Sequence, residues 1–151
     1  MENFNSEIRF HPSRYVKASD PFYPCENQTT FYKDSCYFYA PDYYLHLHYK
    51  DYMGAIAWCG TAESGFVSKC LNGVGSRVMK QNLDKPKFAE SVCLVAANPE
   101  QIASCVDGMV SYYLVNYFSL SKAKDLCESL DSQNKSTCLR AIQKRSTLFV
   151  E

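Results

Sequence analysis

Cysteine is the residue type in this chain with the clearest capacity for chemistry. The chain has 151 residues and eight cysteines: Cys25, Cys36, Cys59, Cys70, Cys93, Cys105, Cys127 and Cys138. Structural zinc sites use close pairs such as C-x₂₋₄-C, and redox and haem sites use C-x-x-C, but no two of these cysteines lie so close. Disulfide bonds are therefore the favoured interpretation, and they indicate an oxidising, extracytoplasmic compartment.

Histidine and tyrosine form a second chemical group, in the stretch YYLHLHYKDY at residues 43–52. Two histidines spaced two residues apart do not share a face of a helix, so they chelate one metal only if the stretch is a strand. We favour a helix here, and we expect neither a metal nor a cofactor. Tyrosine and histidine present an apolar body with a polar tip, which suits recognition as well as packing between helices. The candidate binding residues are Tyr43, Tyr44, His46, His48, Tyr112 and Tyr113.

Catalytic motifs are missing from the sequence. It contains no Gly-x-Ser-x-Gly and no His-Glu-x-x-His, and a cysteine nucleophile needs a free thiol. The glycines of Gly73-Val74-Gly75 lack the preceding strand and the following Lys-Ser/Thr of a phosphate-binding loop, so we assign Gly73 to close helix packing. We predict no catalytic residues. The alternative is a small secreted enzyme, or a small-ligand or metal-binding protein, that uses the His46/His48–tyrosine cluster.

The cysteines recur with a fixed period, and this period predicts the elements that position them. The first cysteines of successive pairs (25, 59, 93, 127) are each 34 residues apart, and the second cysteines (36, 70, 105, 138) are 34, 35 and 33 apart. Apolar residues recur four and one residues before the first cysteine, and one and four residues after the second. This spacing is helical. Each repeat is therefore predicted to be two antiparallel helices, with the first ending near one cysteine and the second beginning near the other.

The predicted helix boundaries follow from capping residues and prolines, such as Asn98 before Pro99. Because Pro24 and Pro41 interrupt the first repeat, we expect only short helices there, near residues 28–35 and 42–48. Residues 1–24 are predicted to be an extended arm packed on the first repeat, and residues 25–151 a single α-helical repeat domain. The other predicted helices span residues 49–60, 64–81, 86–96, 99–117, 120–131 and 134–148.

Repeat symmetry leaves two local patterns of disulfide pairing. One pattern joins the two helices of each repeat: Cys25–Cys36, Cys59–Cys70, Cys93–Cys105 and Cys127–Cys138. The other joins each repeat to the next: Cys36–Cys59, Cys70–Cys93 and Cys105–Cys127. The second pattern leaves two thiols unpaired, whereas the first uses all eight, so the first is favoured.

This layout resembles known helical repeats. Helix–turn–helix units with a period of 34 residues resemble the tetratricopeptide repeat. With one disulfide per unit, they are similar to the secreted cysteine-rich proteins built from Sel1-like repeats. The resemblance covers roughly residues 25–148 and identifies no functional residues. It implies an all-α fold, a right-handed α-solenoid of about four helical hairpins, that binds protein or peptide partners on a curved face.

Charge and hydropathy narrow the functional classes. Sixteen acidic and sixteen basic residues give no net charge, so nothing predicts nucleic-acid binding. No run of about 18 apolar residues is present, so we expect no membrane insertion. Residues 1–15 lack the apolar segment of a signal peptide. We therefore expect that a signal peptide was removed ahead of Met1, or that the sequence is a piece of a larger protein.

The leading prediction is a secreted or extracytoplasmic module that binds or scaffolds a protein or peptide. A structural segment of a longer surface protein is a further interpretation, because the apolar residues 147–150 differ from the polar caps usual in repeat proteins. Two glycosylation sequons begin at Asn27 and Asn134, and we expect both in surface turns.

Overall fold

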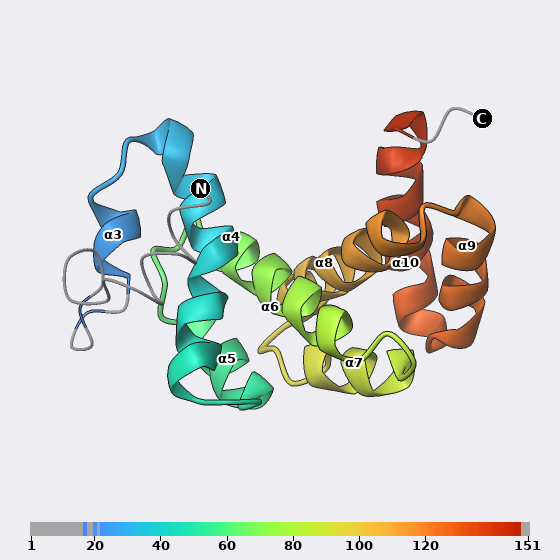
Figure 1. Cartoon of the computed structure of the whole chain (residues 1–151), viewed down its shortest axis with the longest axis horizontal. Coiled ribbons are helices and arrows are strands. Elements are labelled where there is room, and N and C mark those ends of the chain that lie inside the picture. The colour runs from blue at the N-terminus through green and yellow to red at the C-terminus, as the bar shows by residue number, and fades with distance from the viewer. Residues whose placement is uncertain (1–16, 18–19, 21, 149–151) are drawn as a thin grey trace.

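The computed structural model describes residues 17, 20 and 22–148, and this part of the chain is helical with no β-strand (Figure 1). None of its helices has both the length and the apolar character needed to cross a membrane. The helices are α3 (Tyr23–Glu26), α4 (Thr30–Leu47), α5 (Tyr52–Cys59), α6 (Val67–Gln81), α7 (Pro86–Cys93), α8 (Pro99–Tyr117), α9 (Leu120–Ser129), α10 (Ser132–Arg145) and the 3₁₀ turn η1 (Ser146–Leu148).

Four disulfide bonds join the helices in sequential pairs, as the favoured pairing predicts. They are Cys25–Cys36, Cys59–Cys70, Cys93–Cys105 and Cys127–Cys138, and the Cα atoms of each pair lie 5.3 to 5.5 Å apart. No cysteine of the described residues is free. Each bridge joins the last turn of a short helix to the first or second turn of the longer helix that follows.

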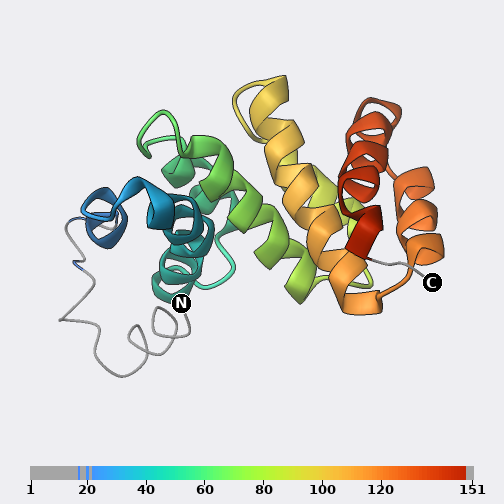
Figure 2. The same ribbon diagram turned by 90° about the horizontal axis from the view of Figure 1, so that it is seen from above.

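The longer helix of each pair lies on the inner side of the molecule. Helix α4 packs on α6, α6 on α8 and α8 on α10, so these four helices follow one another across the inner side (Figures 1 and 2). The shorter helices α5, α7 and α9 contact each other on the outer side. The buried core lies between the two rows, where Leu71, Val106 and Leu126 are among the buried residues.

Glycines let the inner helices approach each other closely. A methyl group at Gly73 would overlap the carbonyl oxygen of Phe38 on α4, and one at Gly108 would overlap the carbonyl oxygen of Asn72 on α6. The prediction that Gly73 serves close helix packing is confirmed. Gly75 approaches the carbonyl oxygen of Cys105 in the same way, so backbone meets backbone on both sides of α6.

Polar side chains and prolines mark the helix starts that the sequence predicts. The side chain of Asn98 accepts a hydrogen bond from the backbone N–H of Gln101, and that of Ser119 accepts one from Lys122. Pro86 and Pro99 occupy the first turns of α7 and α8. The predicted helix 99–117 has the bounds of α8, and the helices after α4 differ from their predicted bounds by at most three residues at either end.

The prediction for the first repeat is wrong. Pro41 does not end a helix, because α4 continues through it from Thr30 to Leu47, and α3 occupies residues 23–26. Proline at this position removes one backbone hydrogen bond, at a cost of about 3 kcal/mol. The Pro41 ring is buried where α4 meets Gly73, and Tyr37 and Ala40 beside it are fully buried. Burial along this face offsets the missing hydrogen bond.

Trp58, the apolar residue directly before Cys59, lies at the end of α5 and packs against the core. Its ring stacks on Phe22 at 4.1 Å between centroids and on Tyr44 at 5.3 Å, and its buried indole N–H has no hydrogen-bond partner within the described part of the chain. The predicted arm lies mostly outside the described residues, which omit 1–16, 18–19 and 21. Phe22 belongs to the buried core, and a helix already begins at Tyr23.

One of the two sequons does not lie in a surface turn. Asn134 is in α10, only 4% exposed, and its side-chain nitrogen donates a hydrogen bond of 2.7 Å to the carboxylate of Glu90. A glycan is attached through this nitrogen, so the folded chain excludes it there. Asn27, by contrast, is exposed at the end of α3.

Candidate functional site

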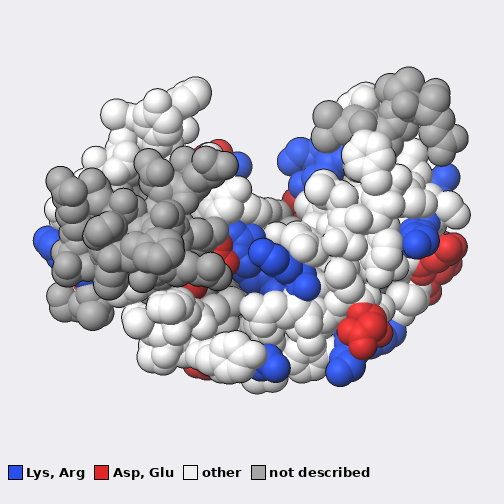
Figure 3. Space-filling model, viewed as in Figure 1, with Lys and Arg blue, Asp and Glu red and all other residues white. Residues whose placement is uncertain are grey.

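Two adjoining hollows lie on the inner side of the molecule (Figure 3). The four-helix hollow has a volume of about 750 Å³ and is lined by α4, α6, α8 and α10. The three-helix hollow has a volume of about 930 Å³ and is lined by α4, α6, α8 and Tyr49 just beyond α4. Phe38 and Tyr39 line both hollows, so the two form one continuous concave surface large enough for several side chains of a ligand.

Equivalent positions of the four inner helices supply the lining. The residues two and six positions after the second cysteine of each pair lie one helical turn apart, opposite the apolar positions that face the core. All eight of them line the hollows: Phe38, Asn72, Asp107 and Arg140 at the first position, and Asp42, Ser76, Ser111 and Lys144 at the second. The repeat that builds the core therefore also builds the concave surface.

A nearly buried arginine crosses the centre of this surface. Arg77 on α6 is 8% exposed and donates two hydrogen bonds to the carboxylate of Asp42 on α4, one of them 2.7 Å long. Its guanidinium also lies 5.2 Å from the ring centroids of Phe38 and Tyr39, within the range of a cation–π contact. These contacts hold Arg77 and both rings in one arrangement on the floor of the hollow.

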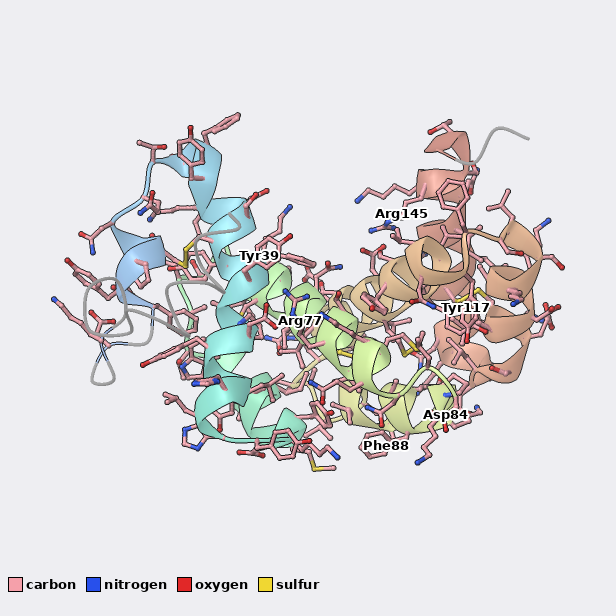
Figure 4. The ribbon with its side chains drawn as sticks, in the orientation of Figure 1. Tyr39, Arg77, Asp84, Phe88, Tyr117 and Arg145 are labelled. Carbon is pink, nitrogen blue, oxygen red and sulfur yellow. A yellow bond between two sulfur atoms is a disulfide. The ribbon has the colours of Figure 1, made fainter. Side chains whose placement is uncertain are left out.

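A second arginine links α10 to α8. Arg145 donates hydrogen bonds of 2.8 and 2.9 Å to the carboxylate of Asp107, and the amide of Asn72 on α6 donates one of 2.7 Å to the same group. Burial opposes ionisation of Asp107, but the hydrogen bonds and charge of Arg145, the hydrogen bond from Asn72 and the charge of Lys144 together outweigh burial and lower the pKa of this carboxyl. Figure 4 shows Tyr39 and Arg145 on opposite sides of the hollow, with Arg77 between them.

The concave surface is consequently fixed before any ligand binds. Asn72 also donates a 3.2 Å hydrogen bond to the backbone carbonyl of Ser104, so three neighbouring helices share one polar network. Such preorganisation reduces the entropy that is lost when a ligand is bound.

Only two of the six predicted binding residues line the concave surface. His46 and Tyr112 both line the three-helix hollow. Tyr43 is 5% exposed within the core region, and burial raises the pKa of its hydroxyl. Tyr113 packs against the core and lies 4.6 Å from the ring of Tyr117.

Tyr44 and His48 lie on another side of α4 and form a separate small cluster. Their rings are 4.6 Å apart, and the Tyr44 hydroxyl donates a hydrogen bond of 2.9 Å to Asp51. His46 is absent from this cluster, because residues two apart on a helix point in different directions. Among the described residues, no group of three or more His, Cys, Asp or Glu side chains could hold a metal ion.

The sequence interpretation missed the residues at the centre of the concave surface. Phe38, Tyr39, Arg77 and Arg145 were not candidates, although each occupies a fixed position relative to its cysteine. Arg77 and Arg145 both stand seven residues after the second cysteine of their repeats. Aligning the polar positions of the repeats, rather than following the tyrosine-rich stretch, would have pointed to them.

Known proteins provide no template for this site: no protein-family model matches the chain, and no curated protein or solved structure shows significant similarity to it.

Proposed function

We propose that this protein is an extracytoplasmic binding module whose concave surface holds a segment of a protein or peptide partner. In this proposal the four disulfide-linked helix pairs are successive turns of a right-handed α-solenoid with a period of about 34 residues. The stepwise packing of α4, α6, α8 and α10, with α5, α7 and α9 outside them, supports that arrangement.

The observation that carries the proposal is the continuous hollow across four inner helices. Its floor combines aromatic rings, charged groups and small residues, and ion pairs between neighbouring helices hold it in place. Extended concave surfaces of stacked helices are the usual binding sites of helical repeat proteins. A hollow that crosses several helices suits an elongated ligand better than a compact one.

The disulfides support the extracytoplasmic part of the proposal. Four bridges and no free cysteine among the described residues are typical of proteins in oxidising compartments. Protein isolated from its source and treated with iodoacetamide before any reduction should take up no label on cysteine. Labelling of several cysteines would contradict secretion through an oxidising pathway.

Selection from a displayed library of random peptides tests the binding function. We expect the folded, disulfide-intact protein to enrich related peptides, measured afterwards by fluorescence anisotropy with labelled synthetic copies. Ser68→Trp places a large ring in the four-helix hollow, since Ser68 is part of its lining, and should abolish binding. The matched control is Ser91→Trp, because Ser91 is exposed on α7 and lines neither hollow.

Two results would contradict the proposal. One is a failure to enrich any peptide on the folded protein. The other is enrichment of peptides whose binding is unaffected by Ser68→Trp, which would place the binding surface elsewhere on the molecule.

A further inference from the structure

The concave surface carries more basic than acidic side chains, although the two kinds are equal in number over the whole chain. The chain has sixteen basic and sixteen acidic residues, so any surplus is local. Of the described residues, four carboxylates line the two hollows, and three of them are paired with a basic neighbour on the next inner helix: Asp34 with Lys69, Asp42 with Arg77 and Asp107 with Arg145.

Three further basic side chains line the hollows without an ion pair to an acidic residue that the structure describes. Lys80 on α6 and Lys144 on α10 form no ion pair among the described residues, and Arg140 donates only to the hydroxyl of Thr137, at 3.1 Å. Glu100 is the one remaining carboxylate of the lining, and it is exposed. Figure 3 shows basic side chains gathered along the hollow between its raised ends.

This distribution leaves the concave surface with a positive surplus over a fixed, internally paired floor. Asp34, Asp42 and Asp107 each already pair with another basic side chain, so none of them forms an ion pair with Lys80, Arg140 or Lys144. Of these three, Lys144 lies near enough to Asp107 for its charge to help lower the pKa of that carboxyl. A ligand that supplies carboxylates at these three positions would form new charge-assisted hydrogen bonds without breaking existing ones. Charge complementarity of this kind determines partner choice and accelerates association.

We propose that the occupant of the concave surface is an acidic, extended segment of a protein, with Asp or Glu side chains at Lys80, Arg140 and Lys144. The inference rests on the proposed binding function and specifies the chemistry of the partner. Aromatic or aliphatic side chains of the same segment would pack on the exposed parts of Tyr39 on α4 and Tyr112 on α8, which line the three-helix hollow together with Lys80.

A peptide fits these features better than a uniformly charged polymer such as a sulfated polysaccharide. Glu100 would repel such a polymer, and Ala103 and the ring of Phe38 offer it apolar contacts that it cannot use. A peptide can alternate carboxylates with apolar side chains. Lys80 on α6 and Arg140 and Lys144 on α10 are separated by α8, so discrete acidic groups on a long segment match them.

Charge reversal at two of these positions tests the inference. The probes are synthetic fluorescein-labelled peptides of about twelve residues, about 40 Å long when extended, with sequences taken from the library selection. Each is compared with a version in which Asn and Gln replace Asp and Glu. The variants are Lys80→Glu and Lys144→Glu, with Lys144→Arg as the conservative substitution. Lys124→Glu is the matched control, because Lys124 is exposed on α9 and lines neither hollow.

We expect the selected peptides to be rich in Asp and Glu, and either charge reversal to weaken their binding about tenfold. Lys124→Glu should leave the affinity within about twofold of the wild type, and Lys144→Arg should bind more tightly than Lys144→Glu because it keeps the positive charge. The peptides in which Asn and Gln replace Asp and Glu should bind more weakly than the acidic ones. Added salt should reduce the affinity of the acidic peptides more than that of the Asn/Gln versions. Circular dichroism and unfolding by urea establish that each variant retains the fold.

Other outcomes separate the inference from the function on which it rests. Peptides that depend on Ser68 but show no excess of acidic residues, or that ignore both charge reversals, would overturn the inference and leave the binding function standing. Absence of any Ser68-dependent peptide would overturn both. Heparin that binds the wild type but neither charge-reversed variant, with no peptide selected, would assign the hollows to a sulfated polysaccharide and contradict the proposal.

Discussion

At the scale of single residues, two glycines determine how closely the central helices pack. Gly75 of α6 faces the carbonyl oxygen of Cys105, and Gly108 of α8 faces that of Asn72, so the backbones of α6 and α8 meet at two points. Asn72 and Asp107, which stand next to these contacts, belong to the polar network of the hollow. The glycines therefore fix both the core and the floor of the candidate site.

Replacing Gly75 by alanine should destabilise the protein. The new methyl group would overlap a backbone oxygen, which cannot move aside as a flexible side chain can, so we expect a loss of about 2 kcal/mol in the free energy of unfolding. Gly65→Ala is the matched control, because no atom would lie within 4 Å of its methyl group. Urea denaturation of both variants measures the difference. If Gly75→Ala and Gly65→Ala had equal free energies of unfolding, α6 and α8 could move apart to accept the methyl group without loss of stability.

The lowered pKa of Asp107 should make part of the stability dependent on pH. The folded state favours the ionised carboxylate, so this contribution is complete above about pH 5 and is lost as the pH falls through the lowered pKa. Asp107→Asn should therefore cost about 1 kcal/mol at neutral pH and much less near pH 2. Urea denaturation at both pH values measures this change.

Glu128→Gln is the control for Asp107→Asn. The ion pair of Glu128 with Lys135 is exposed, so we expect little effect of this substitution at either pH. A deficit of Asp107→Asn that is the same at both pH values would mean that packing, rather than the charge of Asp107, stabilises the contact between α8 and α10.

At the scale of helices, sequence signals were sufficient wherever local chemistry decides the structure. Asn98 and Pro99 give the start of α8 because a capping side chain and a proline act within one turn. Pro41 misled the prediction because its local penalty is outweighed by burial against α6, a segment some thirty residues away. A helix boundary that depends on such a distant partner is not encoded in the neighbouring residues.

Each disulfide joins two consecutive helices across a short loop. Removal of one disulfide should therefore destabilise the protein by an amount that depends on the length of the loop it closes. The loops span 11 or 12 residues, for which the chain-entropy model gives somewhat under 3 kcal/mol. We expect the double variants Cys93→Ala/Cys105→Ala and Cys127→Ala/Cys138→Ala to lose similar free energies of unfolding, measured in urea. A much larger loss for the central pair would show that the bridge stabilises the packing of α7 on α8 beyond its loop.

At the scale of the whole molecule, the concave surface could not be predicted from the aromatic residues alone. Tyr43 and Tyr113 are as aromatic as Tyr112, but which tyrosine faces the hollow depends on the angle at which each helix packs on its neighbour. The disulfide pairing, the helix pairs and the role of Gly73 followed from the period. The ion pairs of Arg77 and Arg145 follow from the same period only after it is applied to polar residues.

The arrangement of neighbours predicts a gradient of local stability. Nine of the fifteen residues of α6 are buried, because α4 and α8 cover it on both sides, whereas four of the fourteen residues of α10 are buried. Amide hydrogen exchange followed by mass spectrometry should therefore find the strongest protection in α6 and α8 and faster exchange in α9 and α10. If amide exchange were equally slow in all helices, the protein would unfold as a single cooperative unit, with α9 and α10 as stable as the central helices.

The confinement of every disulfide to one helix pair has a consequence for how such a chain can change in evolution. Duplication or loss of one segment of about 34 residues adds or removes two cysteines that are already partners. No orphan thiol results, and no bridge elsewhere has to be exchanged. The number of helix pairs, and with it the length of the concave surface, can therefore vary between descendants of one gene without disturbing the oxidative folding of the pairs that remain.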